Sequence, residues 1–396
     1  MNIQLNDSGV PILRQKTLAQ KIKSFLLWTI LVILTLAAAL LVYLCFAGAS
    51  EMAGLTTFRK MSSHPFYTME YENFEYDELV TKECETNDDV IKFFKSKFFK
   101  GLGGMFPGEV EPDPVVRGSV AFSSRTSTYA MVKCRLYNSY DTPIMMVIAK
   151  PANGYRSWNF VDMADLGINS RKELDQWYGN AFQTVAATYC VSEGLNSEFF
   201  GASLISCPVA DCEDTSKANI TPFLAVRLML DKAATVESAI QILDEYDIDF
   251  SSGPYHFFLS DKHGGSAVVE YIDGKMSVTY PETGISHQVC TNKMEDKSVR
   301  SADKDYSNRF KEISVYKTFD DTLRNQYDHD FGIDRTYAFL MLNDKAQDFA
   351  ATDEEHFGTN MYGTQYTVTY WSDKMQMRVI VENDSKSQSY TYDIQP

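Results

Sequence analysis

The chain has 396 residues, 44% of them hydrophobic and 13% aromatic, and its 53 acidic residues outnumber 37 basic ones to give a net charge of −16. This composition is typical of a folded protein with an ample core and excludes a disordered chain. A surface with this excess of acid repels phosphate backbones, so we expect no nucleic-acid partner.

The most hydrophobic segment is Phe25–Ala47, which runs for 23 residues without a charge. About 20 helical residues span the hydrocarbon layer of a bilayer, so we predict one transmembrane helix here. Residues 1–24 carry four Lys or Arg and one Asp, which by the positive-inside rule makes them a cytoplasmic tail and places the rest outside the cell membrane. A cleaved signal peptide is the alternative, because Ala47-Gly48-Ala49 resembles a cleavage site, but the long apolar run favours an uncleaved single-pass anchor.

Residues 48–117 are predicted to form an extracytoplasmic spacer or propeptide-like segment. Within it, Asp88–Lys100 has the interleaved apolar and Lys positions of a short amphipathic helix. Gly101–Pro114 then holds four Gly and three Pro, which interrupt regular structure. A phosphate-binding loop is the alternative for these glycines, but no Gly-Lys-Ser/Thr sequence accompanies them. We therefore place a domain boundary here and predict a folded domain over residues 118–396.

The predicted domain begins with strands. Gly118–Ser124, Tyr129–Tyr137 and Pro143–Pro151 have the pattern of short strands, and the last is apolar on both faces, as expected of a buried strand.

Helices follow these strands, and more strands follow the helices. Thr221–Ile248 predicts two successive helices with Thr221 and Thr235 as their N-caps. Tyr255–Pro281 predicts three strands joined by Gly-Gly and Asp-Gly turns, and Gly363–Ile394 predicts three more. Meanders without β-α-β crossovers indicate an α+β fold in which helices cover antiparallel sheets.

Metal and disulfide chemistry receive little support. The six histidines have no metal-ligand spacing, and Asp328–Asp334 lacks the Gly and the closing Glu of a calcium loop, so we expect neither a metal nor a cofactor. Six cysteines follow the hydrophobic segment, but their spacings identify no pairs. Cys207 and Cys212 form either a small disulfide loop or two buried thiols.

Several segments resemble, in order, the choloylglycine hydrolase family, whose members are linear-amide carbon–nitrogen hydrolases with an N-terminal nucleophile. The family includes bile-salt hydrolases and penicillin V acylases. The similarity covers roughly residues 118 to 394. It is carried by RGSVAF from Arg117, CRLYNSYDTPIMMVIAKPANGYRSWNFVDMADLGI from Cys134, EGLNSEFFGASLI from Glu193, FLAVRLMLDKAATVESAIQILDEYDI from Phe223, YHFFLSDKHGGSAVVEY from Tyr255, CTN from Cys290, SNRF from Ser307 and GTQYTVTYW from Gly363.

The resemblance implies a four-layer αββα sandwich, here preceded by the transmembrane helix. It also implies an active site in which the nucleophile is itself the chain terminus, and its free α-amine, with a pKa near ~8, is the general base. Six positions correspond to active-site residues of the family: Ser119, Arg135, Asn138, Asn196, Asn292 and Arg309.

The resemblance assigns each of these positions a role. Ser119 takes the place of the nucleophilic cysteine, and cutting the bond after Gly118 would free its amine. Arg135 and Arg309 match two active-site arginines.

Three asparagines complete the set. Asn196 and Asn292 match the two that help to form the oxyanion hole. Asn138 stands where the family has an aspartate that holds the amine.

Ser119 and Asn138 depart from the family pattern, which leaves two functions open. The first is hydrolysis of a small-molecule linear N-acyl amide by Ser119. The alternative is a catalytically degenerate relative that binds an amide ligand or acts as a scaffold, because a serine hydroxyl is far less acidic than a thiol and Asn138 lacks the charge that would orient the base.

Overall fold

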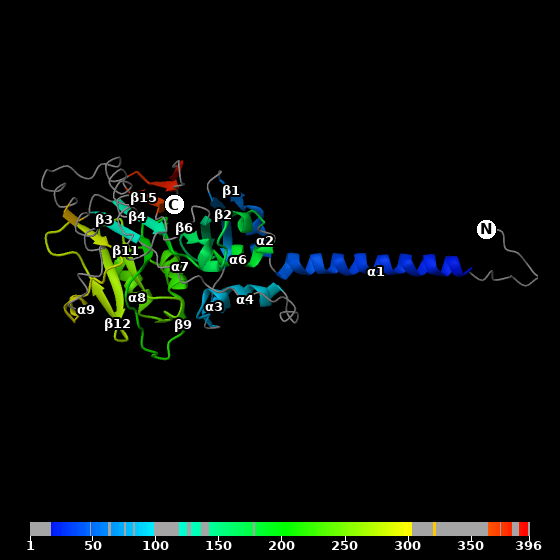
Figure 1. The fold of residues 1–396 in the computed structure, drawn as a ribbon, viewed down its shortest axis with the longest axis horizontal. Coiled ribbons are helices and arrows are strands. Elements are labelled where there is room, and N and C mark those ends of the chain that lie inside the picture. The colour runs from blue at the N-terminus through cyan, green and yellow to red at the C-terminus, as the bar shows by residue number, and fades with distance from the viewer. Residues whose placement is uncertain are drawn as a thin grey trace, which may run out of the picture. The chain divides into compact units, whose positions relative to one another are not determined.

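The structure, a computed structural model, describes residues 17–47, 49–61, 65–74, 77–81, 84–98, 119–124, 128–135, 142–176, 179–302, 320–321, 363–372, 374–381 and 388–394 (Figure 1). The chain divides into two compact units, Met1–Ala49 and Ser50–Pro396. The second unit combines helices with two large sheets, so the predicted α+β class is confirmed.

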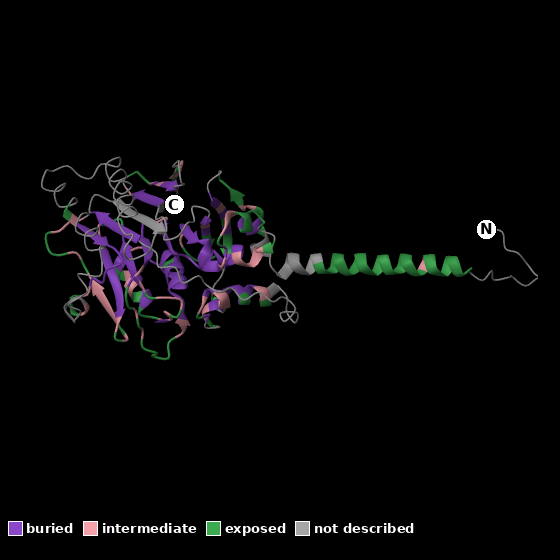
Figure 2. Cartoon of the chain, viewed as in Figure 1, coloured by how far each residue is buried: buried purple, intermediate pink, exposed green. Residues whose placement is uncertain are grey.

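The first unit contains one long helix, α1 (Leu18–Ala47), which extends the predicted span by about two turns toward the N-terminus. Its segment Leu18–Leu40 has a mean hydropathy of 2.1 and no buried residue (Figure 2). Apolar side chains such as Trp28 are 66% exposed. An apolar surface of this size needs a non-aqueous environment. A membrane anchor and a signal sequence both fit such a helix near the N-terminus.

The larger sheet of the second unit has, among the described residues, nine strands in the order β1-β2-β5-β6-β7-β8-β11-β12-β13. Their bounds are β1 (Arg59–Lys60), β2 (Phe66–Phe74), β5 (Ile144–Pro151), β6 (Ser157–Asp162), β7 (Glu193–Asn196), β8 (Gly201–Ser206), β11 (Tyr255–Ser260), β12 (Ser266–Ile272) and β13 (Lys275–Thr279). Strands β11 to β13 form the predicted meander. The sheet is mixed, because β2 pairs with β5 in parallel while the other described neighbours are antiparallel.

Strand β2 lies within the segment predicted to be a spacer, and this prediction needs correction. Tyr67, Met69 and Tyr71 alternate with polar residues along β2 and are at most 1% exposed. Helix α4 (Asn87–Phe98), at the position of the predicted amphipathic helix, packs Phe94 into the same core. The alternation of aromatic and acidic residues is the two-residue period of a half-buried strand. The folded unit therefore begins at Ser50 and not at residue 118.

The smaller sheet is antiparallel and has, in the described part of the chain, six strands in the order β14-β3-β4-β15-β16-β17. They are β3 (Ser119–Ser124), β4 (Thr128–Arg135), β14 (His287–Cys290), β15 (Gly363–Trp371), β16 (Gln376–Val381) and β17 (Gln388–Asp393). The first two strands predicted at the start of the domain and the three in the tail are confirmed here, whereas the strand predicted at Pro143–Pro151 is β5 of the larger sheet. In the smaller sheet β4 and β15 pair although more than two hundred residues separate them in the sequence.

The two predicted helices are α7 (Pro222–Lys232) and α8 (Val236–Leu243). Each begins at its predicted cap: Thr221 Oγ1 accepts from the Leu224 N–H at 3.0 Å, and Thr235 Oγ1 accepts from the Ser238 N–H at 3.2 Å. The remaining described elements are α2 (Ala49–Thr56), α3 (Asp77–Thr81), α5 (Arg171–Asp175), α6 (Ala181–Ala186), α9 (Lys297–Ala302), a 3₁₀ turn at Met163–Leu166, and the short parallel pair β9 (Asn219–Ile220) and β10 (Asp247–Ile248).

Two apolar cores define the layers. The first core packs α4, α6, α7 and α8 against one face of the larger sheet. The second core lies between the sheets, where Phe160 and Phe258 of the larger sheet meet Ala121, Tyr366 and Val368 of the smaller one. The order is therefore helices, sheet, sheet. A helical layer on the outer face of the smaller sheet is not among the described residues, so the fourth layer stays a prediction.

Candidate active site

Ser119 is the first residue of β3 and is only 2% exposed. Alternate side chains of a strand share a face, and Ala121, two residues on, packs in the core between the sheets. The Ser119 side chain therefore lies on the inter-sheet face of β3, at the point where the described strand begins.

Asn292 lies just beyond β14, the neighbour of β3 in the smaller sheet. Its Oδ1 accepts a hydrogen bond from the backbone N–H of Ser119 at 2.9 Å, across 173 residues of sequence. Its Nδ2 donates to the carbonyl of Ser206 at 2.8 Å. Two of the predicted site residues are thus in direct contact. Because the contact uses the amide oxygen, Asn292 accepts from the Ser119 nitrogen, which would become the terminal amine if the chain were cut before Ser119.

Asn196 ends β7 and is completely buried. Its Nδ2 donates to the carbonyls of Leu230 at 2.9 Å and Ala233 at 2.7 Å, at the C-terminal end of α7. Its Oδ1 accepts from the N–H groups of Glu198 and Phe200, both at 3.0 Å. An amide nitrogen carries two hydrogens, and both are engaged here. Asn196 therefore ties α7 to the β7–β8 turn, and its oxyanion role stays a prediction.

We expect Asn196→Ala to destabilise the fold. The substitution leaves two buried carbonyls, the buried Phe200 N–H and the half-buried Glu198 N–H without their side-chain partner. Each buried group left unpaired costs about 1–3 kcal/mol. Urea unfolding should show a loss of several kcal/mol. The control is Asn180→Ala, which removes an exposed side chain with a bond to the Glu173 carbonyl and should cost under about 1 kcal/mol. Equal unfolding midpoints for the two variants would contradict the structural role.

The other predicted site residues are only partly described. Arg135 is the last residue of β4, two positions beyond Lys133, which pairs with Ser119. Its main chain therefore lies close to the start of β3. Asn138 and Arg309 lie outside the described residues.

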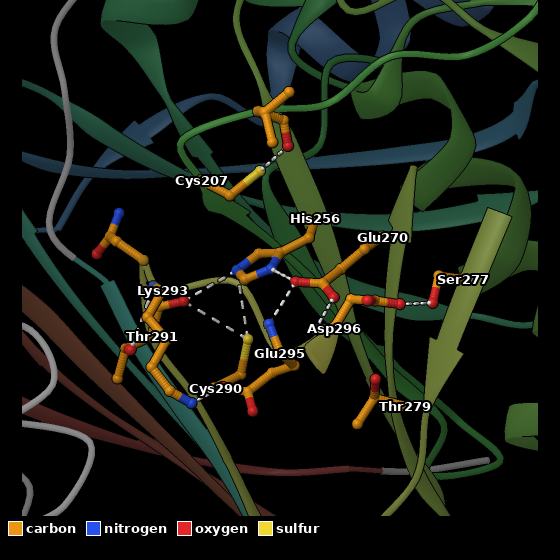
Figure 3. Close-up of polar contacts among 12 residues, drawn as sticks. Cys207, His256, Glu270, Ser277, Thr279, Cys290, Thr291, Lys293, Glu295 and Asp296 are labelled. Atoms are coloured by element: carbon orange, nitrogen blue, oxygen red, sulfur yellow. Dashed lines mark hydrogen bonds and ion pairs between the residues drawn. The ribbon is translucent and has the colours of Figure 1, made fainter. Parts of the chain in front are cut away.

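A buried polar cluster close to Asn292 was missed by the sequence reasoning (Figure 3). His256 Nδ1 lies 3.1 Å from Glu270 Oε1, and His256 Nε2 lies 2.9 Å from the Thr291 carbonyl oxygen. The Cys290 Sγ lies 3.4 Å from the same Nε2. The only sequence signal is one His and one Glu, each placed in an otherwise apolar strand pattern. A charged residue in such a pattern is unusual unless it has a buried partner.

Other sites considered in the sequence receive no support from the structure. Cys207 and Cys212 form no disulfide; Cys207 is buried, and its thiol donates to the Val209 carbonyl at 3.2 Å. Within the described ranges, no group of His, Cys, Asp or Glu could hold a metal ion. A hollow is lined by Ser123 and Tyr280, and Ser123 lies about 13 Å along β3 from Ser119.

Comparison with known proteins bears on the predicted family. Residues 210–386, a little under half of the chain, match the model of the family described as acyl-coenzyme A:6-aminopenicillanic acid acyl-transferase, which is grouped with the choloylglycine hydrolases. The predicted resemblance to the choloylglycine hydrolase family is confirmed. The matched range contains Asn292 but begins beyond Ser119, so the nucleophile stays a prediction.

Solved structures and curated sequences add little to this assignment. The fold is similar to a variant of the conjugated bile acid hydrolase from Clostridium perfringens, with a TM-score of 0.45 and 16% identity, over 69% of this chain and 92% of that one. It is also similar to penicillin V acylase from Agrobacterium tumefaciens, with a TM-score of 0.40 and 15% identity, over 70% and 78% of the two chains. A sequence search of curated proteins finds no match. These likenesses are too distant to bear on the site.

Proposed function

We propose that this protein hydrolyses a small linear N-acyl amide, and that Ser119 becomes its nucleophile once the Gly118–Ser119 bond is cut. The contact between the Ser119 nitrogen and Asn292 Oδ1 is the observation that supports this most directly. A buried amide oxygen directed at the N–H of this one residue is the arrangement needed to orient a terminal amine.

The reaction needs no other base. The Ser119 Oγ attacks the substrate carbonyl carbon while its proton passes to the Ser119 α-amine. The tetrahedral intermediate then breaks its C–N bond, and the protonated amine returns the proton to the leaving nitrogen. Water repeats the two steps on the acyl-serine ester, which releases the acid and regenerates Ser119.

Two observations support this assignment despite the departures from the family pattern. Ser119 is buried, and burial favours a neutral amine over a charged ammonium. Asn292 supplies an oxygen to the Ser119 nitrogen, which is the orienting contact that the resemblance assigned to position 138. The absence of an aspartate at Asn138 therefore does not leave the amine without an acceptor.

Mass spectrometry of the full-length protein purified from membranes tests the proposal. We expect two polypeptides, one of them beginning at Ser119. An intact chain through Gly118 would refute the hydrolase and favour the alternative, a relative that binds amides without hydrolysing them.

We also propose that α1 is an uncleaved anchor with its N-terminus in the cytoplasm and the remainder outside the cell membrane. The excess of Lys and Arg over Asp in residues 1–24 supports this orientation. The same mass spectra test the anchor, because an N-terminal fragment that begins beyond Ala49 would instead identify a removed signal peptide.

A further inference from the structure

The cluster close to Asn292 begins with two charged residues on adjacent strands. His256 lies on β11 and Glu270 on β12, and continuing the register from Phe257 and Val269 makes them cross-strand neighbours. Both are completely buried. Their face of the sheet also carries Phe258 and Val268, which pack in the core between the sheets. The pair is therefore directed toward β14 and the smaller sheet.

Both residues hold the segment 291–296, which follows β14 and carries Asn292. His256 Nε2 contacts the Thr291 carbonyl at 2.9 Å. Glu270 Oε1 accepts from the Glu295 N–H and Oε2 accepts from the Asp296 N–H, both at 2.7 Å. These contacts fix the segment at both ends, at Thr291 and at Glu295 and Asp296 (Figure 3). Asn292 directly follows Thr291 in the sequence.

A contribution to the stability of the fold does not by itself explain why His256 and Glu270 are buried together. Burial by itself would raise the pKa of Glu270, but the hydrogen bond and charge of His256 and the two backbone N–H groups outweigh it and hold the pKa below its usual range. The carboxylate is therefore charged in the interior. Buried charged groups contribute little net stability compared with apolar residues of similar volume, and their better-supported use is to fix one geometry.

An alternative interpretation makes Cys290 a second nucleophile. Cys290 contacts His256, which contacts Glu270, and this is the order of a nucleophile, its base and a carboxylate that orients the base. Two observations exclude it. Cys290 is completely buried, and that burial raises the pKa of its thiol well above the usual value, so it is neither accessible nor ionised. His256 Nε2 also lies closer to the Thr291 oxygen, at 2.9 Å, than to the Cys290 sulfur, at 3.4 Å.

We propose that His256 and Glu270 are positioning residues for Ser119: by fixing the segment 291–296 they hold Asn292 Oδ1 against the Ser119 nitrogen. This inference rests on the proposed function for its effect on catalysis, but the contact itself exists in the uncut chain. The pair acts through Asn292 and touches neither the Ser119 hydroxyl nor any substrate.

The experiment compares Glu270→Gln with Asp247→Asn in the full-length protein in detergent. Glu270→Gln keeps the side-chain shape but replaces one acceptor oxygen with an NH₂ group that cannot accept a backbone N–H. Asp247, the first residue of β10, is a matched control because it is also buried, at 5% exposed. It accepts hydrogen bonds from the backbone N–H groups of Thr215 and Lys217, at 2.8 and 3.1 Å, and these residues lie outside the segment 291–296.

Two readouts separate this inference from the proposed function. The first is hydrogen–deuterium exchange at the amide of residue 119, measured in a Ser119→Ala background that stays uncut. Glu270→Gln should speed this exchange about fivefold to tenfold, as expected for one weakened hydrogen bond, and leave the amides of Phe258 and Val268 unchanged. The second readout is the rate at which newly made chains with Ser119 are cut, which should fall about a hundredfold because a displacement of about 1 Å has effects of that size.

The outcomes are distinct. If wild-type chains are never cut, the proposed function fails, and the exchange experiment still decides the positioning. If Glu270→Gln matches Asp247→Asn in both readouts, the positioning is refuted. Faster exchange at all amides alike would also refute it, because that result signals general destabilisation. If Glu270→Gln fails to fold, His256→Gln replaces it with the same expected results.

Discussion

Ser119→Ala is expected to leave the chain uncut after Gly118 and to abolish turnover of any amide that the wild-type protein hydrolyses. Both reactions need the Ser119 hydroxyl. In the cutting of the chain it attacks the Gly118 carbonyl, and in turnover it attacks the carbonyl of the substrate. Removing the nucleophile of a hydrolase typically lowers kcat by roughly a million-fold. The measurements are fragment masses from the purified protein and the rate of amine release from a panel of N-acyl amides.

Ser123→Ala is the matched control, since Ser123 is a buried residue on the same face of the same strand. It should be cut and should turn over substrate as the wild type does. Ser119→Cys combined with Asn138→Asp should restore the family pattern and raise turnover, because a thiol with a pKa of ~8.5 is a better nucleophile than a hydroxyl. Unchanged turnover in Ser119→Ala would refute the assignment of the nucleophile.

Cutting at Gly118–Ser119 is expected to produce two polypeptides that stay together. The N-terminal polypeptide contributes β2, which pairs with β5 from Phe66 to Phe74, and α4, whose Phe94 is completely buried. Each large apolar side chain buried in this way contributes about 1.5–3 kcal/mol. Because β2 and α4 bury several such side chains, the sum far exceeds what is needed to hold a fragment. If α1 is the proposed anchor, the larger polypeptide should then stay at the membrane with it, although no peptide bond joins the two.

Affinity capture through a tag at the N-terminus measures this retention. In mild detergent both polypeptides should elute together, also after washing with 1 M salt, which screens surface charge but leaves apolar contacts intact. In 8 M urea they should separate. Met69→Asp, which places a charge in the core against β5, should release the larger polypeptide, whereas Glu72→Asp on the exposed side of β2 should not. Release of the larger polypeptide from the wild type in mild detergent would contradict the prediction.

Several parts of this protein are determined by short stretches of sequence. The two capped helices α7 and α8 and the meander β11–β13 were predicted with nearly their observed bounds, and the apolar helix α1 with its C-terminal end. In each of them the deciding information is local: a hydrophobic run, an N-cap three residues before the N–H that it binds, or a tight turn between two strands.

Strand β2 shows where local information ends. Its alternating pattern was visible in the sequence, but the Gly- and Pro-rich segment after it indicated a domain boundary, and no pattern specifies that the strand pairs with β5, some 75 residues later. Strand partners are chosen by burial on both faces of a sheet, which depends on every layer packed around it.

The two asparagines at the site also show where local information ends. The resemblance gave Asn196 and Asn292 the same role, but in the structure their side chains bind different groups. The Asn196 side-chain amide donates its hydrogen bonds to carbonyls at the end of α7. Asn292 Oδ1 accepts a hydrogen bond from the Ser119 nitrogen, 173 residues away in the sequence. The sequence by itself determined the helices, the turns and the family, because these depend on neighbours along the chain. Only the tertiary structure decided which side chain binds the Ser119 nitrogen, because a buried amide binds whichever donors and acceptors the folded chain brings to it.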